Sequence, residues 1–126
     1  MAKFSSPNFL DGGLNYLKNN ATKLMLIKAY TVGDSYATVT GNMLAEATVA
    51  SGDFTLSSSG LSRLVTCAAK SATASASSGA SPNLHFAFTD GVSEVIYVTD
   101  ETTDQVITAG NTVNFPALPY TNLQPT

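Results

Sequence analysis

The stretch LHFAFTDGVSEVIYVT, residues 84–99, decides the fold class of this chain. In its first half, Leu84, Phe86 and Phe88 alternate with smaller or polar residues, the pattern of a strand with one buried face. Asp90-Gly91 then turns the chain, as a hairpin loop commonly does. Residues 94–99 are dense in β-branched residues and tyrosine, which favour strands. The stretch therefore predicts two neighbouring strands joined by a tight turn.

Further strands are expected on both sides of this pair, with turns about every ten residues. Residues 24–28 are apolar on both faces, which predicts a strand in a sheet that is covered on both sides. Residues 30–41 read as a loop that leads into a short extended piece at 37–40. The remaining strand candidates are 44–50 (a strand or a loose segment), 54–56, 61–69, 72–78, 105–108 and 112–115. About eight short strands at this spacing indicate a mainly β fold, an antiparallel β-sandwich or jelly-roll-like arrangement.

One short helix is expected near the N-terminus. Ser6-Pro7 is a helix-start signal, and Leu10, Leu14 and Leu17 recur on one helical face. Gly12-Gly13 opposes the helix, because each glycine costs about 1 kcal/mol relative to alanine. The helix therefore needs tertiary packing, or it begins after the glycines. We expect a single domain over residues 1–126, with extended segments at 1–8 and 116–126, the latter running along a surface.

Composition excludes several classes of protein. No run of about 18 apolar residues exists, so we expect no membrane span. Six Lys and Arg against nine Asp and Glu leave a net charge of −3, which argues against nucleic-acid binding. One cysteine and one histidine exclude an internal disulfide and a multi-histidine metal site. The first residues lack the apolar stretch of a secretory signal, which predicts synthesis and folding in a cytosol.

The residue types needed for catalysis do not occur in a recognisable arrangement. His85 is the one candidate base, and no G-x-S-x-G elbow accompanies it, so we expect an ordinary strand histidine. Cys67 is expected to be a buried, inert thiol. Asp100, Glu101 and Asp104 form an acidic turn, for which solvation is favoured over glycoside hydrolysis or calcium binding. We therefore predict no enzymatic activity, no catalytic residues, no cofactor and no metal.

Three segments carry a resemblance to a known family. Residues 14–24 (LNYLKNNATKL), 85–91 (HFAFTDG) and 108–118 (TAGNTVNFPAL) resemble, in order and spacing, segments of small virion proteins of tailed bacteriophages. The resemblance implies a capsid decoration (cement) protein with a small β-sandwich or jelly-roll fold. Such a protein belongs to the virion, binds the outside of the major capsid protein lattice and stabilises the head. This chain departs from the family at Phe86, where the family has tryptophan. Residues 30–60 have no counterpart in the family, so the resemblance implies nothing about capsid contacts that this region makes.

The two ends of the chain supply candidate interface residues, because apolar and aromatic side chains anchor protein interfaces. They are Phe4, Phe9, Leu10, Pro119, Tyr120 and Leu123. In the alternative interpretation, Phe9 and Leu10 only cover the sandwich core, and Phe4 and Tyr120 lie in frayed termini. The expected partners are the major capsid protein and further copies of the chain, as a dimer or trimer, with no nucleic acid and no membrane.

Two other functions stay open at this level. The first is a structural role in a phage tail, neck or fibre. The second is a glycan-binding module on the particle exterior, for which exposed aromatic residues are the usual platform. Tyr30, Tyr36 and Tyr97 are the mid-chain candidates for such a platform.

Overall fold

The computed structural model describes residues 2–125, and these form a mainly β, antiparallel fold with a helix near the N-terminus, as the sequence predicted. The elements in chain order are α1 (Pro7–Asn20), β1 (Lys23–Ile27), α2 (Tyr36–Gly41), β2 (Met43–Thr48), η1 (Ser51–Asp53), β3 (Phe54–Ser59), β4 (Ser62–Cys67), β5 (Lys70–Thr73), β6 (His85–Thr89), β7 (Val95–Asp100), β8 (Thr112–Phe115) and β9 (Leu118–Asn122).

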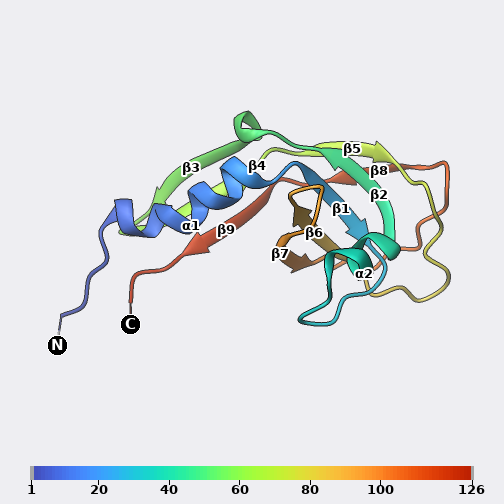
Figure 1. Ribbon diagram of the computed structural model, residues 1–126, viewed down its shortest axis with the longest axis horizontal. Coiled ribbons are helices and arrows are strands. Elements are labelled where there is room, and N and C mark those ends of the chain that lie inside the picture. Colours follow the sequence, from blue (N-terminus) through green and yellow to red (C-terminus); the bar gives the residue numbers. More distant parts are fainter. Residues whose placement is uncertain (1, 126) are drawn as a thin grey trace.

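The predicted pair of strands at 84–99 lies in a four-stranded sheet of order β2-β1-β6-β7 (Figure 1). All three pairings are antiparallel, and Leu24 and Leu26 of β1 lie opposite Phe88 and Phe86 of β6. Both central strands are buried on both faces. This confirms the prediction of a sheet that is covered on both sides.

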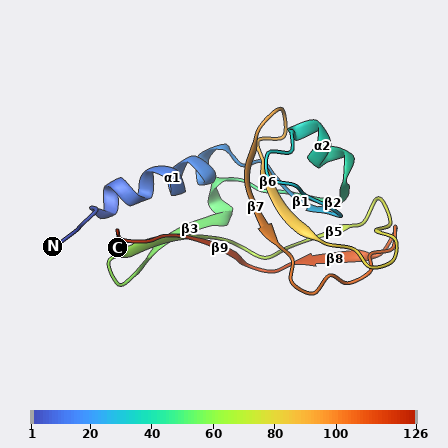
Figure 2. The same ribbon diagram turned by 90° about the horizontal axis from the view of Figure 1, so that it is seen from below.

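The other strands form a long two-stranded ribbon with one additional strand. β4 pairs with β9 and β5 pairs with β8, and β3 adds to the outer side of β4. The register continues unchanged from one pair to the next, because Cys67 lies opposite Leu118 and Lys70 lies opposite Phe115. Pro116 lies in the gap between the two pairs and has no amide hydrogen to donate there. Figure 2 shows this ribbon running along the length of the molecule.

The main core lies between the four-stranded sheet, the ribbon and α1. Phe88 connects these layers through its ring contacts, 5.8 Å from Phe54 of β3 and 6.0 Å from Tyr97 of β7 between centroids. Phe86 makes a similar contact of 5.7 Å with Phe115 of β8. Aromatic pairs at these distances contribute about 0.5–1.5 kcal/mol each beyond the area that they bury. The predicted alternation of residues 84–88 thus corresponds to the face that points into this core.

A smaller second core covers the opposite face of the sheet. Met25, Ile27 and Ala87 are buried there against Val39, which comes from α2. The prediction that residues 37–40 are extended is wrong, because they lie within this helix. Ser35 accepts a hydrogen bond from the Thr38 amide as an N-cap (3.2 Å), and the burial of Val39 supports a turn whose own sequence has low helix propensity.

Helix α1 begins at the predicted Pro7 and includes both glycines. The Ser6 hydroxyl accepts a hydrogen bond from the Phe9 amide at 3.2 Å, which caps the helix. Leu10, Leu14 and Leu17 are its buried residues, so tertiary packing offsets the cost of the glycines. The expectation of an extended segment over residues 1–8 is wrong for residues 7 and 8, which lie in this helix; residues 2–6 form neither helix nor strand, and Met1 lies outside the described residues.

Two of the expected strands differ from the structure, and the C-terminal segment forms a strand for which the sequence named no partner, all for a common reason. Residues 105–108 form no strand, and β5 ends at Thr73, although a strand was expected to reach 78. These two segments lie beside one another, because the Ser78 amide donates to the Ile107 carbonyl at 3.0 Å. In the C-terminal segment, residues 118–122 form strand β9 against β4. The partners that decide these pairings lie about 30 to 60 residues away in sequence.

Candidate functional site

Large apolar side chains are exposed at the end of the molecule where both termini lie. Phe4 is 66% exposed, Phe9 76%, Leu61 67% and Leu123 69%. These four residues, here called the apolar tip, come from the N-terminal segment, the first turn of α1, the β3–β4 turn and the chain after β9. Figures 1 and 2 both show these segments at the same end. Grouped exposed apolar residues of this size are typical of an interaction surface.

One side chain joins three of these segments. The Gln124 amide group donates from Nε2 to the carbonyl oxygens of Ser5 and Leu61, each at 2.7 Å. Its Oε1 accepts a hydrogen bond from the Ser5 amide at 2.9 Å. The Gln124 backbone amide donates to the Ser62 hydroxyl at 3.0 Å. Gln124 therefore holds the N-terminal segment, the β3–β4 turn and the C-terminal segment together.

An ion pair and an amide fix α1 on this end of the ribbon. Arg63 of β4 binds Asp11 of α1 through two nitrogen atoms, at 2.8 and 3.3 Å, and both side chains are less than one-fifth exposed. Asn122 of β9 donates to the Leu10 carbonyl at 2.8 Å. A bidentate, partly buried pair of this kind has a defined geometry. The apolar tip is therefore carried by a rigid support.

The structure separates the six interface candidates into three groups. Phe4, Phe9 and Leu123 belong to the apolar tip. Leu10 is only 7% exposed and packs in the interior, so the alternative interpretation is correct for this residue. Pro119 and Tyr120 are exposed on β9, beside the tip. Sequence analysis missed Leu61, whose only signal is a large apolar residue directly after the turn residues 57–60.

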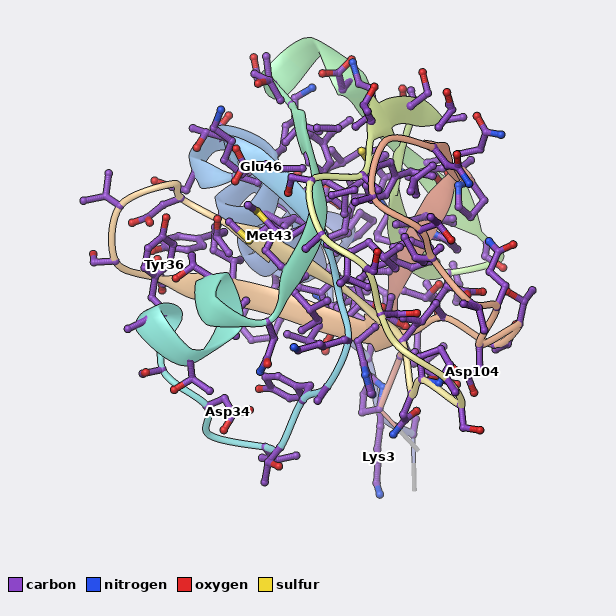
Figure 3. The ribbon with its side chains drawn as sticks, turned by 90° about the vertical axis from the view of Figure 1, so that its right-hand side faces the viewer. Lys3, Asp34, Tyr36, Met43, Glu46 and Asp104 are labelled. Carbon is purple, nitrogen blue, oxygen red and sulfur yellow. The ribbon has the colours of Figure 1, made fainter. Side chains whose placement is uncertain are left out.

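A groove of about 330 Å³ lies next to the tip, between α1, β7 and β9. Its walls carry three tyrosines, Tyr16 of α1, Tyr97 of β7 and Tyr120 of β9, together with Glu94. Tyr97 was a candidate aromatic residue, but Tyr30 packs against the second core on the other face of the sheet. Tyr36 belongs to α2, at the end of the molecule that Figure 3 shows.

Two of the tyrosines are fixed by contacts that cross the groove. The Tyr16 hydroxyl donates to Glu94 Oε1 at 2.6 Å. This hydrogen bond, burial, and the nearby charges of Glu94 and Asp90 raise the pKa of Tyr16 above its usual value. The Tyr120 ring meets Tyr97 edge to face, with 4.9 Å between centroids. The groove is therefore formed before any ligand binds.

The other reactive side chains are engaged in ordinary structural contacts. His85 lies on β6 with Nδ1 3.2 Å from the Asn83 carbonyl, Nε2 3.9 Å from Asp100, and its ring 6.0 Å from that of Tyr30. Cys67 is 1% exposed, and burial, with a smaller contribution from Asp53, raises its pKa to about 11. A thiol in this environment is a weak nucleophile at neutral pH.

The carboxylates of the acidic turn after β7 form hydrogen bonds with different partners. Asp104 accepts a hydrogen bond from the Leu84 amide at 2.8 Å. Glu101 is 8% exposed and accepts from the Thr103 amide and hydroxyl, each at 2.8 Å. Glu101 also borders a second cleft, of about 430 Å³, which is lined by apolar residues together with Thr103, Gln105 and Asn114. Within residues 2–125, no group of three or more His, Cys, Asp or Glu side chains is close enough to hold a metal ion.

Comparisons with protein-family models, with curated proteins and with solved structures found no match for this chain. Among the helices that the structure describes, none is both long and apolar enough to cross a membrane.

Proposed function

We propose that this protein is a structural component of a tailed bacteriophage that decorates the outside of the capsid and stabilises the head. The apolar tip is the observation that carries this proposal. Four large side chains, exposed by 66% to 76%, lie at one end of a protein whose charged residues amount to 12%. A partner surface that covers them removes this apolar area from water, which favours binding.

The partner proposed is the major capsid protein, which the family resemblance implies, and the exposed apolar tip is suited to binding a protein surface. It is built on β4, β9 and α1, which Gln124 and the Arg63–Asp11 pair hold together. A preorganised surface loses little conformational entropy on binding. In this proposal the protein acts by binding alone, without a catalytic step or a cofactor, and is part of the virion exterior.

Binding through the tip must be supported by other contacts. Complete burial of four large apolar side chains contributes at most about 6–12 kcal/mol, at about 1.5–3 kcal/mol each, and association costs about 4–15 kcal/mol, so the two nearly cancel. A single tip therefore gives weak attachment. On a capsid lattice, further contacts between neighbouring copies make binding multivalent, and the occupancy rises without a stronger individual contact. We therefore include a homo-oligomer, a dimer or trimer, in the proposal.

The proposal extends to the architecture. The four-stranded sheet and the ribbon enclose the main core between them, and residues of both layers, such as Leu26 and Val65, are buried in it. We interpret these two layers as a small β-sandwich of the jelly-roll-like type. A closely packed interior of this kind transmits load between the shell subunits that it bridges.

The test uses the phage whose genome encodes this chain. Particles that lack the protein are expected to release DNA at a lower temperature or in a milder osmotic shock than complete particles. Added wild-type protein restores the resistance, and the double variant Phe4→Ser, Phe9→Ser restores it less. Val32→Ser is the matched control, because Val32 is 93% exposed but lies in the loop before α2. Equal stability of particles with and without the protein contradicts the proposal.

The number of copies in each particle distinguishes a protein of the head from a protein of the tail. A shell protein is present in a fixed ratio to the coat protein, at hundreds of copies in each particle. A few to tens of copies indicate a structural protein of the tail, neck or fibre instead. Quantitative mass spectrometry of purified particles, or electron microscopy of the head surface, distinguishes these outcomes.

A further inference from the structure

The groove beside the apolar tip has a chemical character that capsid binding does not require. Three tyrosine rings and one carboxylate line it, over a floor that includes Leu14 and Ile96. None of the described residues that line it is basic. Ligand sites of small molecules are concave, largely apolar and supplied with a few convergent polar groups, and their volumes begin at about 300 Å³.

The aromatic wall is rigid. Tyr97 stacks on Phe88, with the ring planes 7° apart, and Phe88 in turn contacts the buried Phe54. Tyr120 meets the Tyr97 ring edge to face. This series of rings connects the groove to the centre of the main core. The Tyr97 and Tyr120 rings are therefore held in place, and ligand binding orders few side chains.

The charge of the groove selects the class of ligand. Glu94 is the charged residue on the wall, and Asp90 is close enough to act electrostatically on Tyr16. Both carboxylates repel an anion. The face of an aromatic ring also carries negative charge density, so a cation over tyrosine is attracted by the rings as well as by the carboxylates.

We propose that this groove binds an organic ammonium cation, specifically a quaternary or methylated ammonium group. Tyr16, Tyr97 and Tyr120 present aromatic surface to its methyl groups, and Glu94 balances its charge. A volume of about 330 Å³ accommodates a trimethylammonium group and a short apolar chain. The inference does not depend on the proposed function, because it rests on a different surface.

The test compares two ligands of the same shape. Choline and its neutral isostere 3,3-dimethyl-1-butanol are titrated into the full-length protein and followed by the NMR signals of residues around the groove. A cation–π contact is worth about 0.5–2 kcal/mol, so choline is expected to bind about 2- to 30-fold more tightly than the isostere. Equal affinities, a neutral saccharide that binds more tightly than choline, or no shift with 50 mM choline at low salt overturns the proposal.

Variants identify the groups responsible. Glu94→Gln is expected to weaken choline binding several-fold and to leave the isostere unaffected. Tyr120→Leu is expected to lower choline affinity, whereas Tyr120→Phe, which keeps the ring, retains most of it. Tyr36→Leu is the control, because Tyr36 lies on α2. Thermal unfolding of each variant shows whether it is folded. If Tyr120→Phe loses choline binding to the same extent as Tyr120→Leu, the aromatic ring of Tyr120 does not contribute as proposed.

A second pair of ligands distinguishes the source of the ammonium group. Nε-Trimethyllysine amide represents a modified side chain of a partner protein, and choline represents a free or lipid-derived head group. Tighter binding of either ligand supports an ammonium site in the groove, and the preferred ligand identifies the source of the ammonium group. Particle stability measured in parallel separates this inference from the proposed function, because Glu94→Gln is expected to leave capsid stabilisation unchanged.

Discussion

Replacing Gln124 with alanine tests whether one side chain organises the apolar tip. The change removes three hydrogen bonds, two to carbonyl oxygens of Ser5 and Leu61 and one from the Ser5 amide. The backbone bond from Gln124 to the Ser62 hydroxyl remains. A typical hydrogen bond contributes about 0.5–1.5 kcal/mol, and these groups are partly open to water, so we expect about 1.5–2 kcal/mol in total. This corresponds to a 10- to 30-fold increase in local opening of the N-terminal segment.

Hydrogen exchange measures this opening directly. The Ser5 amide is expected to exchange 10- to 30-fold faster in Gln124→Ala than in the wild type, while amides of β1 and β6 keep their protection. Gln105→Ala is the control, because Gln105 is an exposed glutamine between β7 and β8. An unchanged exchange rate at Ser5 would falsify the role assigned to Gln124. A loss of protection throughout the sheet would also refute it, because the tip would then be part of the global unfolding unit.

Three further predictions concern the body of the protein. Gly91 and Gly79 both have φ of +78°, but a Cβ at Gly91 lies 2.6 Å from the Thr22 hydroxyl, whereas none of the described atoms lies within 4 Å at Gly79. Gly91→Ala is therefore expected to lower the urea midpoint of unfolding more than Gly79→Ala does. Gly79→Ala costs about 1–2 kcal/mol through its backbone conformation alone. Equal losses of stability in the two variants argue against the clash at Gly91. Cys67, with its pKa raised to about 11, is expected to resist iodoacetamide in the folded protein and to react in denaturant, and rapid native-state labelling contradicts its burial. Hydrogen bonds from the amides of Glu94, Ser93 and Val92 lower the pKa of Asp90 below its usual 3.8. The ionised Asp90 carboxylate therefore stabilises the folded protein above the unfolded pKa, and this stabilisation is lost as the pH falls through the lower folded pKa. In Asp90→Asn, the free energy of unfolding is expected to fall less steeply with acid below about pH 4. An identical pH dependence in the variant and the wild type argues against this linkage.

The candidate site could be predicted from the sequence only in part. Phe4, Phe9 and Leu123 were candidates because apolar and aromatic side chains in the flanking segments are typical interface anchors, and the structure leaves all three exposed. Leu61 was missed, because nothing local indicates that the β3–β4 turn lies beside both termini. The same limit applies to the groove, whose Tyr16, Tyr97 and Tyr120 are separated by 81 and 23 residues.

Helix α2 illustrates the same limit within the fold. Residues 36–41 (YATVTG) contain a β-branched valine and two threonines, which locally favour an extended backbone. The helix forms because Ser35 caps it and Val39 fills the second core against Met25 and Ile27. A local pattern contains no information about a space that other segments create.

The amino-acid sequence alone determined the β character of the chain, the helix that starts at Ser6-Pro7, and the buried face of residues 84–88. These features depend on alternation and capping, which act over a few neighbouring residues. Tertiary structure alone decided that residues 112–122 pair with β5 and β4, that Leu10 is buried while Phe9 is exposed, and that Gln124 meets Ser5. Contacts between residues this far apart depend on how all the segments share one core, and no local pattern records that arrangement.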